Sequence, residues 1–392
     1  MKRREGVIIG LMWLVSSTLY LIANLNGLGL TYDSNLYIEI ANQITAFGIL
    51  NADGLNIKPP IFPMIISWVG VGFLPFLNYL ALELNLLLVY LIGKKLNVNW
   101  IRLSFLSLMA FFTPIYLVHS FIWTEPYFTI LILTSFYLFL LNENSKKPFW
   151  LAIAILLITI LPFVRFAGIF VLIPFVIITL IRSSNKQRLY LVVGLFILGL
   201  AMGAWVFSFS SGFSARLSQW ISVLPDRDHT VYLYNIRSFL EALSLLVIPL
   251  NAPSFARLLI GFIIIGAVCY ASLYFFSSPK ERTITHSFPV VFLIYYLLIH
   301  TVFKIEFYTA ERYLTPLYPI LIFCFFSYLN ERESKLSLFK KRALMVFVSI
   351  VLLYGTSRTI KNVFFWNEVR AEQNNFKTLS PNKSAFLSLR KF

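Results

Sequence analysis

Charged residues are scarce in this chain of 392 residues, at 13% against 58% hydrophobic residues. A soluble domain is typically about a quarter charged and half apolar, so the composition excludes an ordinary water-soluble globule. A membrane-spanning helix uses roughly 20 mostly apolar residues, and about eleven such helices would occupy a little over half of the chain. The composition therefore predicts an all-α, polytopic membrane protein.

Cysteine and histidine are also rare, with two and four residues respectively. Cys269 and Cys324 lie inside apolar runs, as expected for small core residues, and no Cys/His spacing typical of a zinc site occurs. The basic amino terminus leads into an apolar run long enough to span a bilayer, without an A-x-A-like cleavage site. We therefore expect no disulfide, no zinc site and no cleaved signal peptide.

Long apolar runs are what the chain has in abundance. They predict eleven spans, at 7–26, 79–96, 101–119, 124–141, 148–163, 166–182, 189–209, 254–277, 287–303, 313–329 and 343–360. The fifth and sixth are short and are interrupted by Pro162 and Arg165. A further apolar stretch, 59–77, holds four prolines, so we expect a juxtamembrane helix on the outer surface there.

The net charge of +16 follows the expected alternation of the loops. With the amino terminus inside, more than half of the 33 Lys and Arg fall in short inner loops, and most of the 17 Asp and Glu fall on the outer side. This pattern is a topology signal and removes support for a nucleic-acid partner. It predicts a transmembrane domain over 1–361, with outer loops 27–78 and 210–253, and a short outer tail over 362–392.

Asp33 opens a stretch of the first outer loop in which apolar residues recur at helical spacing. We expect it to be the N-cap of that helix, with Ser34 as the alternative. One interpretation is that Asp33 only caps an amphipathic helix on the bilayer. The other is that its carboxylate takes a proton from an acceptor at the membrane surface. One residue can do both.

Four motifs along the chain resemble, in their order, the GT-C superfamily of membrane glycosyltransferases, of the protein-mannosyltransferase and aminoarabinose-transferase type. They are Asp33 with Tyr37, Gly48 and Lys58-Pro59-Pro60; WTEP at 123–126; VRFAG at 164–168; and ERYLTP at 311–316. Ser34 stands where the family usually has a second acidic residue, and no large soluble outer domain follows. The likeness covers roughly residues 1–330.

The resemblance implies an inverting enzyme that moves a sugar from a polyprenyl-phosphate donor to a hydroxyl or amine of a glycan, lipid or protein. It implies an active site on the outer face of a bacterial plasma membrane. The roles that it suggests are catalytic for Asp33 and Glu125, phosphate-binding for Lys58, Arg165 and Arg312, and supporting for Tyr37, Glu311 and Tyr313. A divalent cation would be compatible, although the sequence identifies no ligands for one.

Each candidate also has a simpler explanation. The arginines can snorkel to the interface, and a Glu followed by Pro is favoured at a helix start such as 125–126. Glu83 is expected to pair with an outer arginine, His119 to line the same cavity, and 226–229 to form a solvated turn.

Two alternative functions are compatible with the sequence. The first is a non-enzymatic solute transporter, which would need polar groups at the middle of several spans. The second is a polymerase or ligase of the O-antigen type, with its key arginines in the large outer loop at Arg216, Arg227 and Arg237.

Overall fold

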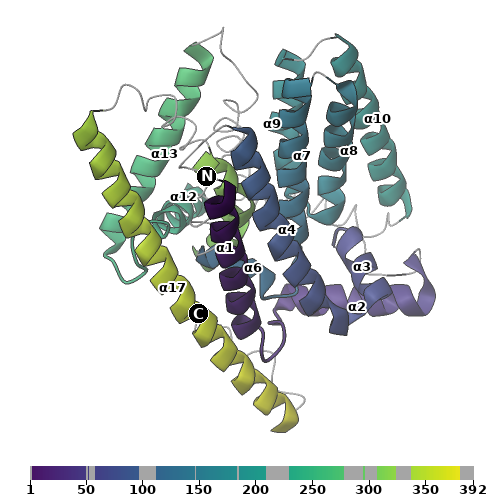
Figure 1. Ribbon diagram of the computed structural model, residues 1–392. Helices are drawn as coiled ribbons and strands as arrows, with labels where there is room; N and C mark the ends of the chain where they lie inside the picture. The colour runs from purple at the N-terminus through teal and green to yellow at the C-terminus, as the bar shows by residue number, and fades with distance from the viewer. Residues whose placement is uncertain are drawn as a thin grey trace.

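The computed structural model describes residues 2–49, 52, 58–96, 112–145, 147–182, 185–208, 229–277, 295, 307–323 and 337–379. These residues form helices joined by short connections, and the single β contact among them is an isolated bridge between Gly29 and Phe121. Most of the helices run side by side as a bundle, and α2 lies crosswise at one end (Figure 1).

The long helices build the bundle. They are α1 (Lys2–Ala23), α4 (Leu74–Lys95), α7 (Glu125–Ser145), α8 (Pro148–Val164), α9 (Gly168–Arg182), α10 (Asn185–Ser208), α13 (Ser254–Ser277) and α17 (Leu338–Leu379). Four segments are long and apolar enough to cross a membrane, within α1, η3–α4, α7 and α17, and apolar stretches of α8, α10 and α13 are shorter. This fits an all-α membrane protein. The predicted number of eleven spans is not confirmed, since several of those segments lie outside the described residues.

Apolar side chains face outward along the bundle. Phe196, Leu200 and Leu353 are all at least 60% exposed, whereas Phe128, Phe136 and Phe239 are fully buried in the core. A soluble protein rarely exposes so much apolar surface, so the outer surface suits contact with lipid.

The stretch 59–77 differs from the single surface helix that we expected. It contains α3 (Ile61–Val69), a short turn η3 (Val71–Phe73) and the start of α4. Gly70 ends α3 with a φ of 77°, a conformation that favours glycine, and Pro75 lies in the first turn of α4, where no amide donor is needed. The helix that holds the second predicted span therefore starts at Leu74 and not near residue 79.

The shorter helices lie between and beside the long ones (Figure 1). They are α2 (Tyr32–Phe47), α3, α6 (Thr113–His119), α12 (His229–Ser244), α15 (Phe307–Leu314) and the turn η6 (Thr315–Leu317). α2 packs against α3, and α12 against α15. Which end faces the cytoplasm stays a prediction.

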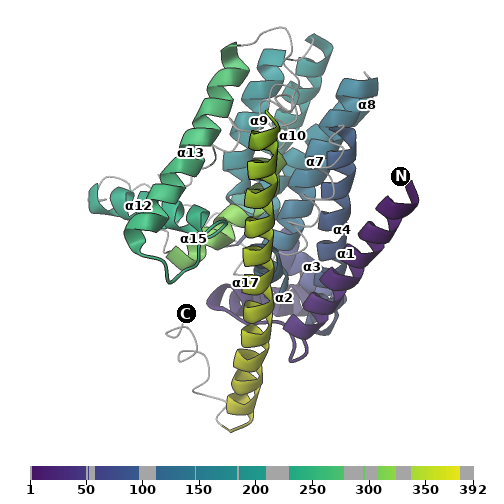
Figure 2. The ribbon, with the colours of Figure 1, turned by 60° about the vertical axis from the view of Figure 1, so that its left-hand side comes forward.

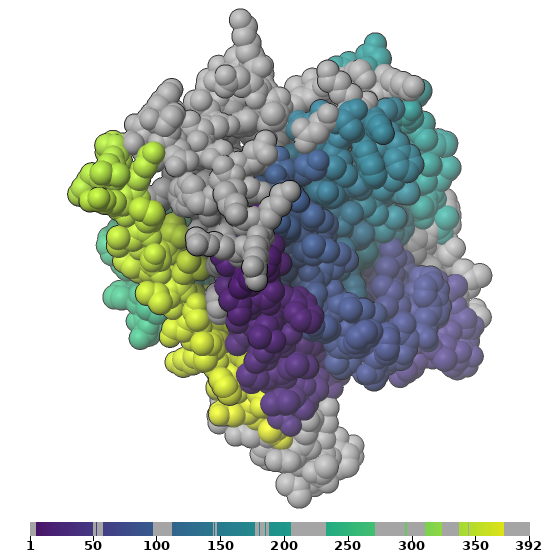
Figure 3. All heavy atoms as spheres, viewed as in Figure 1, coloured from purple at the N-terminus to yellow at the C-terminus, as the bar shows by residue number. Residues whose placement is uncertain are grey.

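The last helix, α17, is longer than predicted. It does not end near residue 360 but continues to Leu379, and it extends beyond the rest of the bundle (Figure 2). Residues 362–379, which the sequence assigned to a tail, are its final turns. α17 lies along α1 on the surface of the molecule (Figure 3) and also contacts α6, where the hydroxyls of Thr113 and Thr359 are 2.9 Å apart.

Candidate active site

The start of α2 is fixed by a reciprocal cap that leaves Asp33 free. The amide of Ser34 donates to Thr31 Oγ1 at 3.3 Å, and the amide of Thr31 donates to Ser34 Oγ at 3.0 Å. Thr31 is thus the N-cap, and the predictions of Asp33 or Ser34 in that position are wrong. Because Thr31 and Ser34 satisfy each other's backbone amides, the carboxylate of Asp33 can point elsewhere.

Asp33 instead contacts two cations. Lys58 Nζ lies 2.6 Å from Asp33 Oδ1, and Arg312 Nη1 donates to Asp33 Oδ2 at 3.0 Å. Lys58 also lies over the ring of Tyr37, with 5.3 Å to the ring centroid. Tyr37 is buried and packs edge-on against Phe62, so its ring is a fixed surface for the Lys58 side chain. The interactions described for Tyr37 do not include a direct contact with Asp33.

The second carboxylate, Glu125, begins α7 and is fully buried. Both Arg312 and Arg165 form ion pairs with Glu125 Oε1, and Arg312 Nη2 also donates to Oε2 at 3.4 Å. The Thr124 hydroxyl donates to the same Oε2 at 3.4 Å. Glu125 therefore connects the start of α7 to the turn that contains Arg165 and to α15, which contains Arg312.

Arg165 reaches Glu125 from the turn between α8 and α9. Its backbone is extended (φ −156°), and the amide of Gly168 donates to its carbonyl at 2.8 Å. A Cβ on Gly168 would lie 2.4 Å from the carbonyl carbon of Leu161, so only glycine allows this close return of the chain. The Arg-aromatic-x-Gly motif thus has a structural reason. The Arg165 guanidinium lies over the ring of Tyr313 at 4.5 Å.

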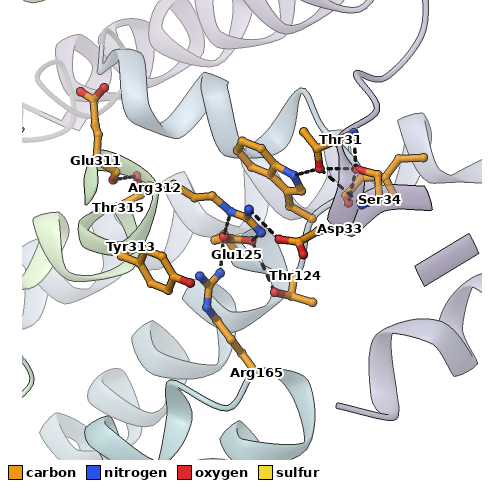
Figure 4. Close-up of polar contacts among 12 residues, drawn as sticks. Thr31, Asp33, Ser34, Thr124, Glu125, Arg165, Glu311, Arg312, Tyr313 and Thr315 are labelled. Carbon is orange, nitrogen blue, oxygen red and sulfur yellow. Dashed lines mark hydrogen bonds and ion pairs between the residues drawn. The ribbon is translucent and has the colours of Figure 1, made fainter. Parts of the chain in front are cut away.

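Together, Asp33, Lys58, Glu125, Arg165 and Arg312 form one charged cluster, whose central contacts are drawn in Figure 4. Its three cations outnumber its two carboxylates. Its members are not equally accessible: the Asp33 side chain is 30% exposed, whereas that of Glu125 has no exposed surface. Asp33 is thus the carboxylate that an approaching molecule can reach.

Opposing effects act on the pKa of Asp33. Burial alone would raise it, but the positive charges and hydrogen bonds of Arg312 and Lys58 outweigh burial and lower the pKa to about 2. In this arrangement Asp33 is ionised and strongly paired at neutral pH. It becomes an effective proton acceptor only if its cations find another partner.

Three other sequence candidates lie away from the charged cluster. Glu311 points away from it (Figure 4) and pairs with Arg358 of α17 at 2.8 Å. Glu83 accepts hydrogen bonds from the hydroxyls of Ser16 and Ser17, so the expected arginine partner is wrong for its described contacts.

His119 is buried against Asn85, with 3.1 Å between Nε2 and the amide nitrogen. It makes none of the contacts described for the cluster. The solvated turn expected at 226–229 lies outside the described residues except for His229, which begins α12.

The described residues do not offer an obvious metal site. No group of three or more His, Cys, Asp or Glu side chains converges among them, and both carboxylates of the charged cluster are paired with cations. The divalent cation that the family resemblance allowed therefore has no ligand set among these residues.

Trp123 is a member of the site that the sequence motifs did not single out. The Arg312 guanidinium lies 4.0 Å over its ring, a distance at which the cation is attracted to the aromatic face. Its indole nitrogen donates to the N-cap residue Thr31 at 2.9 Å. The sequence could have indicated Trp123, because it is the first residue of the WTEP motif that contains Glu125.

Similarity to known proteins is found at the level of structure. No protein-family model matches the chain, and no curated protein sequence matches it. Among solved structures, it is similar to the oligosaccharyltransferase of Archaeoglobus fulgidus in its apo form, with a TM-score of 0.50 and 15% identity. The match covers 93% of this chain and 55% of the other.

The likeness to the archaeal enzyme is one of fold alone. The identity is only 15%, and this chain spans about half the length of that enzyme. The GT-C superfamily that the motifs suggest, and its narrower mannosyltransferase or aminoarabinose-transferase type, stay predictions from the sequence. A proposal about chemistry therefore rests on the charged cluster.

Proposed function

We propose that the protein is an inverting glycosyltransferase that uses a polyprenyl-phosphate-linked sugar and acts on the outer face of a bacterial plasma membrane. The observation that carries this proposal is the contact of Asp33, the accessible carboxylate of the cluster, with Lys58 and Arg312. The sugar acceptor is a hydroxyl or amine of a glycan, lipid or protein.

The excess of cations in the cluster suits a lipid-linked phosphate. Arg312 and Arg165 are 11% and 10% exposed, so they are largely removed from water. Attraction between opposite charges is stronger in such a buried position than in water. Guanidinium groups bind phosphate oxygens through paired N–H donors, and Lys58 adds a compact positive charge. A polyprenyl chain would remain in the bilayer beside the apolar surface while its phosphate reaches the cluster.

Donor binding would change the partners of Asp33. Arg312 and Asp33 are in direct contact at 3.0 Å, so a phosphate that binds Arg312 and Lys58 must displace the carboxylate. Asp33 then loses the positive charges that hold its pKa at about 2, and its pKa rises toward the ordinary range. The bound donor thereby produces a better general base beside its own sugar.

The transfer follows from this arrangement. Asp33 accepts the proton of the acceptor O–H or N–H while that atom attacks the anomeric carbon. The bond between the anomeric carbon and the phosphate oxygen breaks, and its electron pair leaves with the polyprenyl phosphate. Arg312, Arg165 and Lys58 stabilise the negative charge that develops on the leaving phosphate. Attack opposite the leaving group inverts the anomeric configuration.

The alternatives gain no support from a specific observation. A polymerase or ligase was expected to use Arg216, Arg227 and Arg237. The first two lie outside the described residues, and Arg237 is paired with Glu241 at 2.9 Å. For a transporter, polar groups were expected at the middle of several spans, and the charged cluster instead lies where helices begin and end, at the start of α2, the start of α7 and the turn between α8 and α9.

The experiment that tests the proposal is a transfer assay with the purified chain in lipid nanodiscs. Radiolabelled sugars linked to polyprenyl phosphate and polyprenyl diphosphate are offered with cell-envelope acceptors, and transfer of the label to the acceptor is measured together with release of the matching polyprenyl phosphate or diphosphate. Arg312→Ala should abolish transfer, while Arg237→Ala, which removes a 60% exposed arginine of α12, should retain it. The reverse pattern would favour the polymerase or ligase.

A further inference from the structure

Arg370, near the end of α17, is a buried cation outside the charged cluster. It is 3% exposed, and its Nε and Nη2 atoms are buried without a hydrogen-bond partner. No carboxylate pairs with it in the part of the chain that the structure describes. Burying an unpaired arginine is costly, so stability alone gives little reason for its presence.

The first set of contacts joins Arg370 to the segment that leads into α2. Its Nη1 donates to the carbonyls of Ala23 and Gly27 and, at 3.0 Å, to Asn24 Oδ1. Three residues earlier on α17, Asn367 accepts from Asn26 at 2.8 Å. The end of α17 therefore holds the connection between α1 and α2 in place.

That connection is bonded to the strand-like segment before α7. The amide of Gly29 donates to the Ser120 carbonyl at 2.9 Å, and the amide of Ile122 donates to the Gly29 carbonyl at 3.2 Å. Two residues beyond Gly29 is Thr31, the N-cap that sets the start of α2 and thus the place of Asp33.

The second set of contacts is a stack of aromatic rings that ends at Arg312. The Arg370 guanidinium lies 5.1 Å from the ring centroid of Phe121. Phe121 stacks on Trp123, with centroids 4.6 Å apart, and Arg312 lies on Trp123 at 4.0 Å. The Phe121 ring is closely confined, because a Cβ added to Gly29 would lie 2.3 Å from it.

We propose that Arg370 is a positioning residue of the active site, which fixes Asp33 through residues 24–31 and Arg312 through the rings of Phe121 and Trp123. Arginine suits this task because one planar group can donate to several carbonyls and also lie flat on a ring. The catalytic part of this inference rests on the proposed glycosyl transfer.

The substitution Arg370→Met distinguishes a positioning role of Arg370 from a role in the stability of the fold. Arg370→Met keeps an unbranched apolar side chain and removes a buried charge, a change that is often neutral or stabilising for a fold. Lys361→Met is the matched control, since it removes a positive charge from an exposed position on the same helix. Arg370→Lys keeps the charge and loses the planar group.

The test combines hydrogen exchange with kinetics on the full chain in nanodiscs. In Arg370→Met we expect an unchanged melting temperature, at least tenfold faster exchange of the Gly29 and Ile122 amides, and turnover lower by roughly 10- to 100-fold. Lys361→Met should match the wild type in all three. If Arg370→Met does not fold, Arg370→Lys provides the same readouts, with the same local increase in exchange.

Each outcome decides the proposal. Local loss of protection with a retained melting temperature supports positioning. Wild-type exchange at Gly29 and Ile122, or an equal loss of protection throughout α7 and α8, overturns it. If the wild type transfers no sugar from any donor, the proposed function fails, whereas the exchange result still decides whether Arg370 orders the site.

Discussion

Two parts of the molecule place a carboxylate between two arginines, and the comparison separates a structural ion pair from a candidate active site. Glu241 of α12 binds Arg237 and Arg257, which lie 4 and 16 residues away in the sequence, and Ser254. Glu125 binds Arg165 and Arg312, and Arg312 lies 187 residues away. The first cluster is local, whereas the second joins distant parts of the chain.

The two clusters also differ in what surrounds the carboxylate. Arg257 donates to the Ala252 carbonyl at 2.9 Å as well as to Glu241, so it closes the corner between α12 and α13. The charged cluster instead includes a second carboxylate, Asp33, which is 30% exposed and whose ion pairs within the described part of the chain are with cations that a phosphate can attract. A carboxylate between arginines is thus not by itself a sign of function. Exposure and an exchangeable partner are the distinguishing features.

The largest expected effect on folding comes from removing the charge of Glu125. Glu125→Gln leaves Arg165 without its carboxylate in a buried position, which should lower the free energy of unfolding by about 3–5 kcal/mol. Glu241→Gln should cost about 1–3 kcal/mol, because Arg237 is 60% exposed and can turn to water. Thermal and denaturant unfolding in detergent would measure both, and equal losses would contradict the distinction.

Arg312→Lys should reduce turnover by on the order of 10- to 100-fold, because an ammonium cannot contact Glu125 and the donor phosphate through a planar fork. Arg257→Lys is the counterpart in the local cluster and should leave turnover unchanged. Steady-state kinetics with the donor identified in the transfer assay provides the measurement. Full activity of Arg312→Lys would remove the need for paired donors at this position.

A smaller effect is expected when the turn that carries Arg165 is shifted. Gly168→Ala places a Cβ against the backbone of Leu161 and should lower turnover by roughly tenfold through displacement of Arg165. Gly199→Ala in α10, where nothing lies within 4 Å of the added carbon, is the control and should be fully active. Similar activity in the two variants would show that Arg165 tolerates movement.

The smallest expected effect is on stability at low pH. The pKa of Asp33 is about 2 in the folded chain, below its ordinary value of 3.8, so its ionised form stabilises the fold above pH 3.8. That contribution is lost as the pH falls through about 2. The wild type should melt at a higher temperature than Asp33→Asn at neutral pH, and the two should converge near pH 2. A gap that does not change with pH would contradict the pairing.

Much of the charged cluster could be predicted from the sequence. Asp33, Lys58, Glu125, Arg165 and Arg312 stand at the ends of apolar segments, where charges without a role are costly. The order of the motifs indicated which of them belong together. The apolar runs predicted the bounds of α13, 254–277, as the structure has them, but they missed the start of α4 and the end of α17.

The predictions that were wrong concerned packing between distant segments, which a local sequence pattern does not indicate. Glu311 and Arg312 are adjacent on α15, so they point in different directions, and Glu311 found its partner in Arg358 on α17. The last turns of α17 are too polar for an apolar window, which hid both their helical form and the position of Arg370. Thr31 was missed as the cap because two neighbouring residues, Asp33 and Ser34, were equally good candidates.

The central claim is that Asp33 is the general base, and the turnover of Asp33→Asn tests it most directly. The substitution does not touch the cap, which Thr31 and Ser34 form, and it removes the proton affinity while keeping the shape of the side chain. We predict a folded protein that binds the donor and turns over roughly 10²–10⁴-fold more slowly. Near-normal turnover in a folded Asp33→Asn variant would contradict the account.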